Sequence, residues 1–173
     1  FGGLGLSHRA RRKGLWNFVG VDRDQADRLL ARQRAEPLLH LAGGKAIAAR
    51  AHEVDTDEVA ILGAAGVPKP DARIVAESLV DADLRGIHSH GVSRLRIYVE
   101  RLRAGGNRPA GELVLVSDAP SLAVLDANDI LAQVASARAV ELAAEKAMVT
   151  GCGVVCVRGA SHFGAAGYWA RLL

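Results

Sequence analysis

The apolar residues between positions 55 and 104 recur every three or four residues, the spacing of helices that bury one face. This pattern predicts three consecutive helices, over residues 55–66, 71–85 and 93–104. Each of them ends at or just before a glycine, the residue that most often closes the last turn of a helix. The first part of the patterned region is therefore expected to be helical.

From residue 113 the pattern changes to short runs of apolar and β-branched residues. It predicts strands over residues 113–116 and 122–126, an Ala-rich helix over 133–150, a strand over 153–157 and a further helix that begins near Ala165. The third strand is continuously apolar, which is typical of a strand buried on both faces. Strand, helix and strand in this order predict a crossover unit with two parallel strands. We therefore expect an α/β protein, in which a helical segment is followed by a mixed sheet with helices.

The first 55 residues follow neither pattern. They are rich in arginine, are interrupted by glycines and a proline, and contain one plausible amphipathic helix, over residues 22–35. We expect two units: an atypical Arg-rich N-terminal extension with little order, residues 1–55, and a folded unit, residues 56–173.

The net charge of +3 arises at the N-terminus. Residues 1–13 hold four basic and no acidic groups, whereas the other 160 residues hold 18 basic and 19 acidic groups. A basic arm could contact phosphate backbones, but no aromatic interleaving or nucleic-acid-binding fold supports that interpretation. We therefore expect a solvated tail and no nucleic-acid partner. No apolar run reaches the roughly 20 residues that a membrane helix needs, and the N-terminus lacks the apolar core of a signal peptide. We therefore expect a cytoplasmic protein with no membrane partner.

Two segments place titratable residues in glycine-flanked turns, where functional sites concentrate. The first is His88-Ser89-His90-Gly91, with Arg94 and Tyr98 in the helix that follows. A histidine can give or take the proton in a carbonyl reduction, and an arginine on the same helix face as Tyr98 can bind a substrate carboxylate. Gly91 would let a substrate approach the backbone. As an alternative, His90 only caps the helix, Arg94 is a surface charge and Tyr98 belongs to the core.

The second segment, residues 159–167, reads Gly-Ala-Ser-His-Phe-Gly-Ala-Ala-Gly and lies between a predicted strand and the start of a helix. Open α/β sheets bind ligands at the carboxyl ends of their strands, and the free N–H groups of a helix start suit a phosphate. The glycine spacing differs from the Rossmann fingerprint. As an alternative, the segment is a plain connection in which His162 makes a local hydrogen bond.

Both segments resemble the two hallmark motifs of the malate/L-lactate dehydrogenase family. The first match is residues 81–95 together with Tyr98, and the second is residues 161–168, Ser-His-Phe-Gly-Ala-Ala-Gly-Tyr, in the same order and at a compatible distance. Residues 71–76 and 153–155 are similar as well. The resemblance covers residues 56–173 and implies the family's non-Rossmann fold.

The resemblance implies an enzyme that passes hydride between NAD or NADP and C2 of a small 2-hydroxy or 2-oxo acid. Branches of the family act on ureidoglycolate, sulfolactate, diketogulonate or a cyclic imino acid. By similarity, His90 would give and take the proton with Ser89 in a relay, and Arg94 and Tyr98 would bind the substrate. His162 is a second candidate for the catalytic base. The cofactor would contact His162, Phe163, Gly164, Ala165 and Ala166, and the enzyme would be a homodimer.

The sequence departs from the family in three ways. Members of the family are longer, and most of their nucleotide-binding residues lie beyond the position of Leu173. Residues 126–133 replace a Gly-rich turn with bulkier residues, and residues 1–55 do not resemble the family's lead-in. The chain also starts at Phe1, has Met148 as its single methionine and stops inside a predicted helix. We therefore expect a truncated, N-terminal piece of such an enzyme that is inactive by itself.

Two other functions compete with the dehydrogenase. His88, His90 and His162 could hold a catalytic metal with one open position in a hydrolase, whereas the dehydrogenase would bind no metal there. The chain could also be a non-catalytic fragment. The two cysteines, Cys152 and Cys156, are too few for a disulfide framework and lack the spacing of a zinc site.

Overall fold

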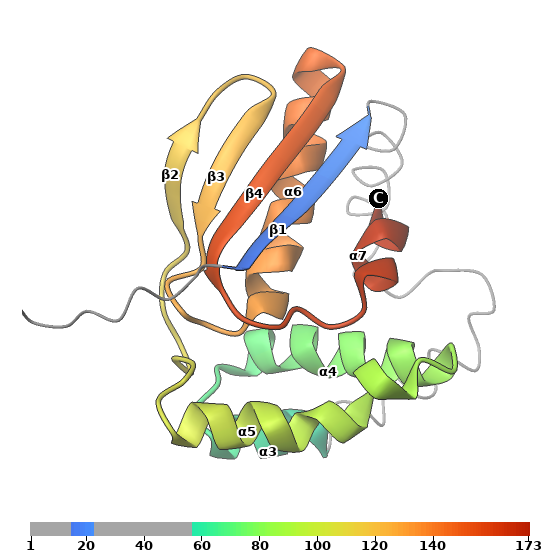
Figure 1. Ribbon diagram of the computed structural model, residues 1–173, viewed down its shortest axis with the longest axis vertical. Helices are drawn as coiled ribbons and strands as arrows, with labels where there is room; N and C mark the ends of the chain where they lie inside the picture. The colour runs from blue at the N-terminus through green and yellow to red at the C-terminus, as the bar shows by residue number, and fades with distance from the viewer. Residues whose placement is uncertain (1–14, 23–56) are drawn as a thin grey trace, which may run out of the picture.

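The computed structural model describes residues 15–22 and 57–173 of the chain. These residues form a helical base and, above it, a four-stranded sheet backed by a long helix (Figure 1). The helix expected over residues 22–35 lies outside the described residues, except that Asp22 is the last residue of a strand.

Three helices form the base: α3 (Glu58–Ala64), α4 (Lys69–Leu84) and α5 (Leu95–Arg103). They pack around one cluster of apolar side chains, of which Leu62 and Leu79 are completely buried. The prediction of three helices is confirmed. The third begins later than expected, because two 3₁₀ turns, η1 (His88–His90) and η2 (Val92–Arg94), precede it.

The sheet has the strand order β1-β4-β3-β2. Its strands are β1 (Leu15–Asp22), β2 (Val114–Asp118), β3 (Leu122–Asp126) and β4 (Cys152–Ala160). β3 and β4 run parallel, as the crossover pattern predicts, whereas β1 and β2 pair antiparallel with their neighbours. The sheet is therefore mixed, and the expected α/β class is confirmed.

The crossover helix α6 (Ala132–Thr150) covers one face of this sheet (Figure 1). Val155 of β4 is completely buried, whereas the next residue, Cys156, is half-buried. A Cβ atom on Gly153 would overlap the carbonyl oxygen of Ala143, so helix and strand meet backbone to backbone there. The prediction that β4 is buried on both faces is wrong: burial alternates along it, because α6 packs on a single face.

β1 is a strand that the sequence analysis missed. It pairs with β4 from Leu15 opposite Ala160 to Asp22 opposite Cys152. The segment lies within the Arg-rich stretch assigned to an extension, and its paired residues in β4 are 130 to 145 positions away in sequence. A division of the chain at residue 55 separates this strand from the sheet that it joins.

The last element is α7 (Ala166–Leu172), the helix expected near Ala165. A loop of residues 161–165 links it to β4 and crosses the top of the helical base (Figure 1). None of the helices in the described part of the chain is both long and apolar enough to cross a membrane.

Candidate active site

The turn between β3 and α6 holds two residues in a backbone conformation that most side chains avoid. Asn128 and Asp129 have φ values of 49° and 62°, which asparagine and aspartate tolerate better than other non-glycine residues. The carboxylate of Asp126 accepts the N–H of Asn128 at 2.8 Å, and the N–H of Asp129 donates to the carbonyl of Gly159 at 3.0 Å. The turn therefore joins the start of α6 to the end of β4.

Asn107 ties the same turn to the segment that follows β4. Its side chain is buried, and its Nδ2 donates to the carbonyl oxygen of Asp129 and to Oγ of Ser161, both at 3.1 Å. Its Oδ1 is buried without a hydrogen-bond partner among the described residues. Farther along the segment, the indole N–H of Trp169 donates to the carbonyl of Phe163 at 2.9 Å, which fixes the segment against α7.

The loop before α5 carries the first predicted motif. Oγ of Ser89 lies 2.9 Å from Nδ1 of His90, as a relay requires, and Nε of Arg94 donates to the carbonyl of Ser89 at 2.6 Å. The expectation that Gly91 leaves room for a substrate is wrong. A Cβ atom on Gly91 would overlap the carboxylate of Asp83, so a protein side chain fills that space.

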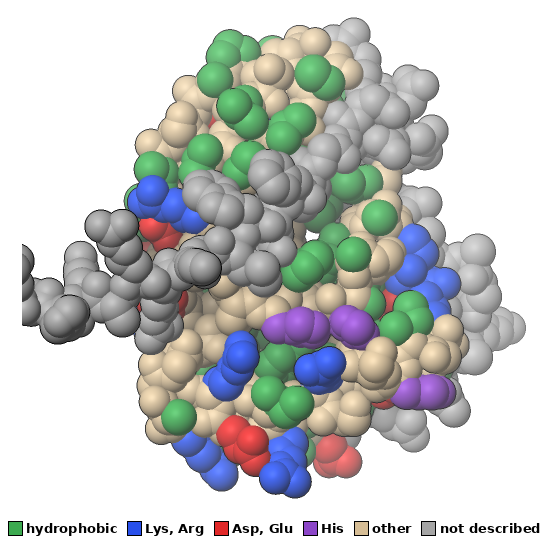
Figure 2. All heavy atoms as spheres, viewed as in Figure 1, with side chains coloured by type: hydrophobic (Ala, Val, Ile, Leu, Met, Phe, Trp, Pro, Cys, Tyr) green, Lys and Arg blue, Asp and Glu red, His purple; other side chains and the backbone are tan. Residues whose placement is uncertain are grey.

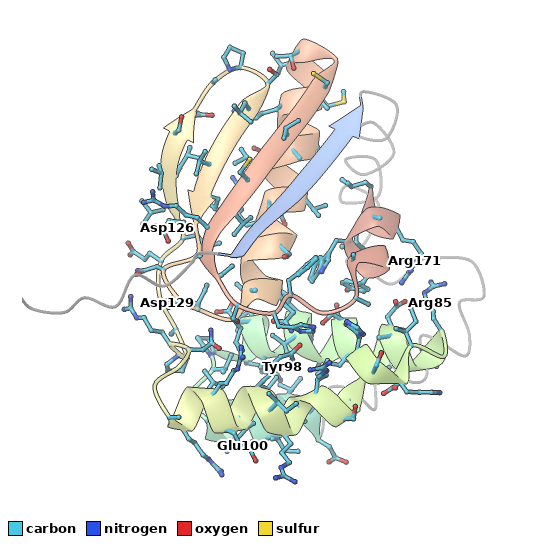
Figure 3. The ribbon with its side chains drawn as sticks, in the orientation of Figure 1. Arg85, Tyr98, Glu100, Asp126, Asp129 and Arg171 are labelled. Carbon is cyan, nitrogen blue, oxygen red and sulfur yellow. The ribbon has the colours of Figure 1, made fainter. Side chains whose placement is uncertain are left out.

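The two motifs meet between the helical base and the sheet. The rings of His90 and His162 stack with their centroids 5.2 Å apart, and the hydroxyl of Tyr98 lies 2.8 Å from Nδ1 of His162. Figure 2 shows two adjacent histidine side chains on one face of the molecule, with basic side chains close by and a third histidine farther away. Figure 3 shows Tyr98 on α5, pointing toward the sheet. Folding therefore unites residues that are 64 positions apart.

The surroundings of His162 keep it uncharged. Burial lowers the pKa of His162 from its usual 6.5, and electrostatic interactions with Arg94, His90 and Arg101 lower it further. The backbone N–H of Gly164 donates to Nδ1 of His162 at 3.3 Å. Nδ1 is thus an acceptor, and the neutral ring carries its hydrogen on Nε2. Burial also raises the pKa of Tyr98, so that its hydroxyl stays protonated and can donate to the same Nδ1.

Such an arrangement can bind an anion and handle a proton. A neutral imidazole with a free Nε2–H can donate to an oxygen atom, and a second imidazole stacked on it can deliver or accept a proton. The Arg94 guanidinium is near enough to act on His162, and its terminal nitrogens make no hydrogen bond to another described residue. A small carboxylic acid with an adjacent oxygen fits this set of groups.

Comparison with known proteins identifies the family. The model of the family described as malate/L-lactate dehydrogenase matches residues 50–173. The chain belongs to that family. Among its relatives, the malate dehydrogenase of Pyrococcus abyssi is 46% identical over 114 residues, which cover 66% of this chain and 32% of the relative. The ureidoglycolate dehydrogenase (NAD(+)) of Escherichia coli (strain K12) is 39% identical over 107 residues, 62% of this chain and 31% of the relative.

Solved structures of the family have the same fold. Malate dehydrogenase from Pyrococcus horikoshii OT3 matches with a TM-score of 0.68 and 41% identity, over 70% of this chain and 35% of the other. Sulfolactate dehydrogenase from Methanocaldococcus jannaschii also has a TM-score of 0.68, with 40% identity, over 70% of this chain and 36% of the other. The chain thus spans about a third of the length of the relatives that it matches.

Two residues set the backbone of the turn at residues 126–133. Asn128 and Asp129 both have left-handed conformations. Glycine adopts that conformation freely, and Asn and Asp are the next most tolerant residues. The turn therefore forms although residues 126–133 contain no glycine.

The structure does not assemble the three-histidine metal site. Nδ1 of His88 pairs with Asp83 at 2.9 Å, and its side chain is 77% exposed, while His90 and His162 stack on each other. No group of three His, Cys, Asp or Glu side chains among the described residues is arranged to hold a metal ion. A metal hydrolase built on His88 is therefore not supported.

Sequence reasoning missed three residues that shape the site. Asp83 and Asn107 hold its loops, and Gln133 is a completely buried amide that acts on the hydroxyl of Tyr98. Asp83 lay within the first motif, so it could have been singled out. The other two gave no signal, because a polar residue beside a turn or at a helix start is common in any protein.

Proposed function

We propose that this chain carries the substrate-binding and proton-transfer residues of an NAD(P)-dependent 2-hydroxy acid dehydrogenase. The observation that supports this most is the convergence of His90, His162 and Arg94 from two separate motifs. In the reaction, a hydride moves between the nicotinamide and C2 of the substrate, and a proton moves to or from the oxygen on C2. The relatives' names point to malate, sulfolactate or ureidoglycolate as substrates.

His162 and His90 divide the proton chemistry in this proposal. A neutral His162 donates its Nε2–H to the carbonyl oxygen of a 2-oxo acid and so polarises it. His90, with Ser89 on its Nδ1, gives the proton as the oxygen becomes a hydroxyl, and takes it in the reverse direction. Tyr98 holds the ring of His162 in place. Arg94 binds the substrate carboxylate with its two terminal nitrogens.

The segment His162 to Ala166 is proposed to contact the nicotinamide end of the cofactor. When bound, the nicotinamide supplies or accepts the hydride. The buried, unpaired Oδ1 of Asn107, beside Ser161, fits a ligand with a hydrogen-bond donor such as a carboxamide. NAD and NADP both remain candidates, since one relative's name carries NAD(+) and another's, from Chromohalobacter salexigens, carries NADP(+).

The proposal is tested in a hybrid enzyme. Residues 57–173 of this chain replace the matched third of the Pyrococcus abyssi malate dehydrogenase, and oxaloacetate, pyruvate and sulfopyruvate are offered with NADH or NADPH. We expect turnover with at least one acid. His90→Gln should lower kcat by about 10²–10⁴-fold, the usual contribution of a general acid or base, whereas Arg94→Met should mainly raise the KM of the acid. A folded hybrid that binds cofactor but reduces none of these acids would contradict the proposal.

The chain itself provides a second test. Trp169 contacts the proposed cofactor segment through Phe163, so its fluorescence should respond to a bound nicotinamide. A Trp16→Phe variant leaves Trp169 as the single tryptophan and removes the fluorescence of Trp16.

The expected homodimer and the cytoplasmic location stay predictions. Light scattering on the purified chain measures whether it forms a dimer.

A further inference from the structure

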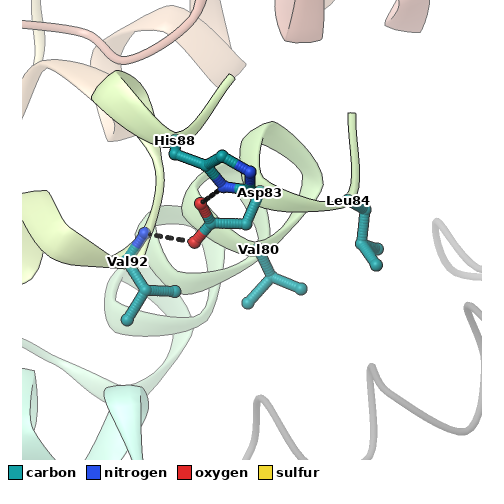
Figure 4. Close-up of a pocket in the computed structure, with 5 residues that line it drawn as sticks. All are labelled: Val80, Asp83, Leu84, His88 and Val92. Atoms are coloured by element: carbon teal, nitrogen blue, oxygen red, sulfur yellow. Dashed lines mark hydrogen bonds and ion pairs between the residues drawn. The ribbon is translucent and has the colours of Figure 1, made fainter. Parts of the chain in front are cut away.

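Asp83 reaches from the end of α4 to the loop that carries His90 (Figure 4). Its Oδ2 accepts the backbone N–H of Val92 at 2.7 Å, and its Oδ1 lies 2.9 Å from Nδ1 of His88. One carboxylate therefore holds both ends of the segment 88–92. Ser89 and His90 lie between these two fixed points.

Gly91 shows how closely the carboxylate fits this loop. Its φ of −86° and ψ of −159° are ordinary extended values, so backbone conformation does not require a glycine there. A Cβ atom at Gly91 would instead overlap all three carboxyl atoms of Asp83. The glycine is needed because the Asp83 carboxylate occupies the place of its side chain.

The other side-chain hydrogen bonds of the loop are local. Oγ of Ser93 donates to the carbonyl of His88 at 3.0 Å, and Nε of Arg94 donates to the carbonyl of Ser89 at 2.6 Å. These bonds keep the two 3₁₀ turns compact, but they do not attach them to a helix of the base. Within residues 57–173, the side-chain hydrogen bonds that join the segment 88–92 to α4 both end on Asp83.

We propose that Asp83 is a positioning residue that sets where His90 stands opposite His162. The effect of Asp83 on catalysis rests on the proposed function. The effect of Asp83 on the position of the His90 ring does not depend on it. A backbone shift at Gly91 or Val92 would move His90 relative to His162, whose ring centroid lies 5.2 Å away. A displacement of about 1 Å in a catalytic group can cost roughly 100-fold in rate.

A double-mutant cycle on this chain tests the position directly. Asp83→Ala, Gly91→Ala and the double variant are compared by NMR, with the hydrogen exchange of the Val92 amide and the ring signals of His90 and His162 as readouts. Each single variant should expose the Val92 amide and shift the His90 ring signals. In the double variant the added Cβ finds the space that the carboxylate left, so Gly91→Ala should have little further effect. Equal, additive effects of Gly91→Ala in both backgrounds would overturn the proposal.

Two further variants separate positioning from a general loss of stability. Asp83→Asn keeps an oxygen for the Val92 N–H and should restore most of the wild-type His90 signals. Asp71→Ala removes a carboxylate from the other end of α4 and should leave the His90 and Val92 signals unchanged. If Asp83→Ala does not fold, the contrast between Asp83→Asn and Gly91→Ala decides the matter in the same way. If the His90 signals of Asp83→Asn are displaced as far as those of Gly91→Ala, the proposal that Asp83 positions the loop is excluded.

The hybrid dehydrogenase then measures the catalytic consequence. Asp83→Ala should lower kcat by about 100-fold with a much smaller change in the KM of the cofactor, and Asp83→Asn should recover most of it. A hybrid that never turns over contradicts the proposed function, while the NMR cycle still decides the role of Asp83. If Asp83→Ala displaces the His90 ring but leaves kcat unchanged, Asp83 positions the ring without any effect on catalysis, and only the catalytic half of the proposal is refuted.

Discussion

At the scale of single residues, neighbours decide what each histidine can do. His88, His90 and His162 have the same intrinsic chemistry, but His88 is exposed beside Asp83 and His162 is partly buried among positive charges. The burial of His162 and its acceptor bonds at Nδ1 favour a neutral ring. We therefore expect His162 to take up a proton at a lower pH in the folded chain than in the unfolded chain.

The lowered pKa of His162 predicts a loss of stability in mild acid. The unfolded chain takes up a proton at His162 near pH 6.5, whereas the folded chain takes it up only at a lower pH. The free energy of unfolding should therefore fall as the pH drops below about 6.5, until the folded state is protonated as well. Urea unfolding between pH 7.5 and 5 measures this. His162→Gln should show a shallower decrease than the wild type, and identical slopes would contradict the prediction.

At the scale of elements, the turn between β3 and α6 matters most for the site. It joins β4 through Asp129 and Gly159, and it joins the loop before β2 through Asn107. Its left-handed residues thus position the start of α6 and the end of β4 together. A residue that cannot adopt the left-handed conformation would strain the turn and shift the start of α6 and the end of β4.

Substitutions at Asn128 should report this strain. A left-handed conformation costs most L-residues roughly 1–2 kcal/mol, less for asparagine and nothing for glycine. Asn128→Ala should therefore lower the free energy of unfolding by about 1 kcal/mol, and Asn128→Gly should be at least as stable as Asn128→Ala. Thermal and urea unfolding of the two variants compare them. An alanine variant more stable than the glycine variant would show that the turn has another conformation.

At the scale of the whole molecule, a strand from the N-terminal region completes the sheet. β1 pairs with β4, which also pairs with β3, so β4 lies in the interior of the sheet. β4 leads directly into the segment that carries His162. The N-terminal strand thus stabilises the element on which the site depends.

Removal of residues 1–22 should destabilise the protein, whereas removal of residues 1–14 should not. The longer deletion uncovers one edge of β4, and each lost backbone hydrogen bond costs a net 0.5–1.5 kcal/mol or so. We expect a decrease of a few kcal/mol in the free energy of unfolding, and faster hydrogen exchange at β4 amides that face β1. The shorter deletion, which keeps β1 (Leu15–Asp22), is the control. Equal stability of the two deletions would mean that β1 contributes nothing.

Local pattern determined much of this protein. Apolar spacing and closing glycines located the helices of the base, α6 and the strands β2, β3 and β4, because those signals lie within each segment. The two motifs identified the residues of the candidate site for the same reason. The chemistry of His90 and of Arg94 can be inferred from the residue types alone.

Tertiary structure decided the rest. The pairing of β1 with β4, the single buried face of β4 and the contact between His90 and His162 depend on residues far apart in sequence. The role of Gly91 is the clearest case. A glycine at this position suggests room for a ligand. The carboxylate of Asp83, near the end of α4, fills that space because α4 packs against the loop. Which groups share a space is set by packing, and a linear pattern carries no information about it.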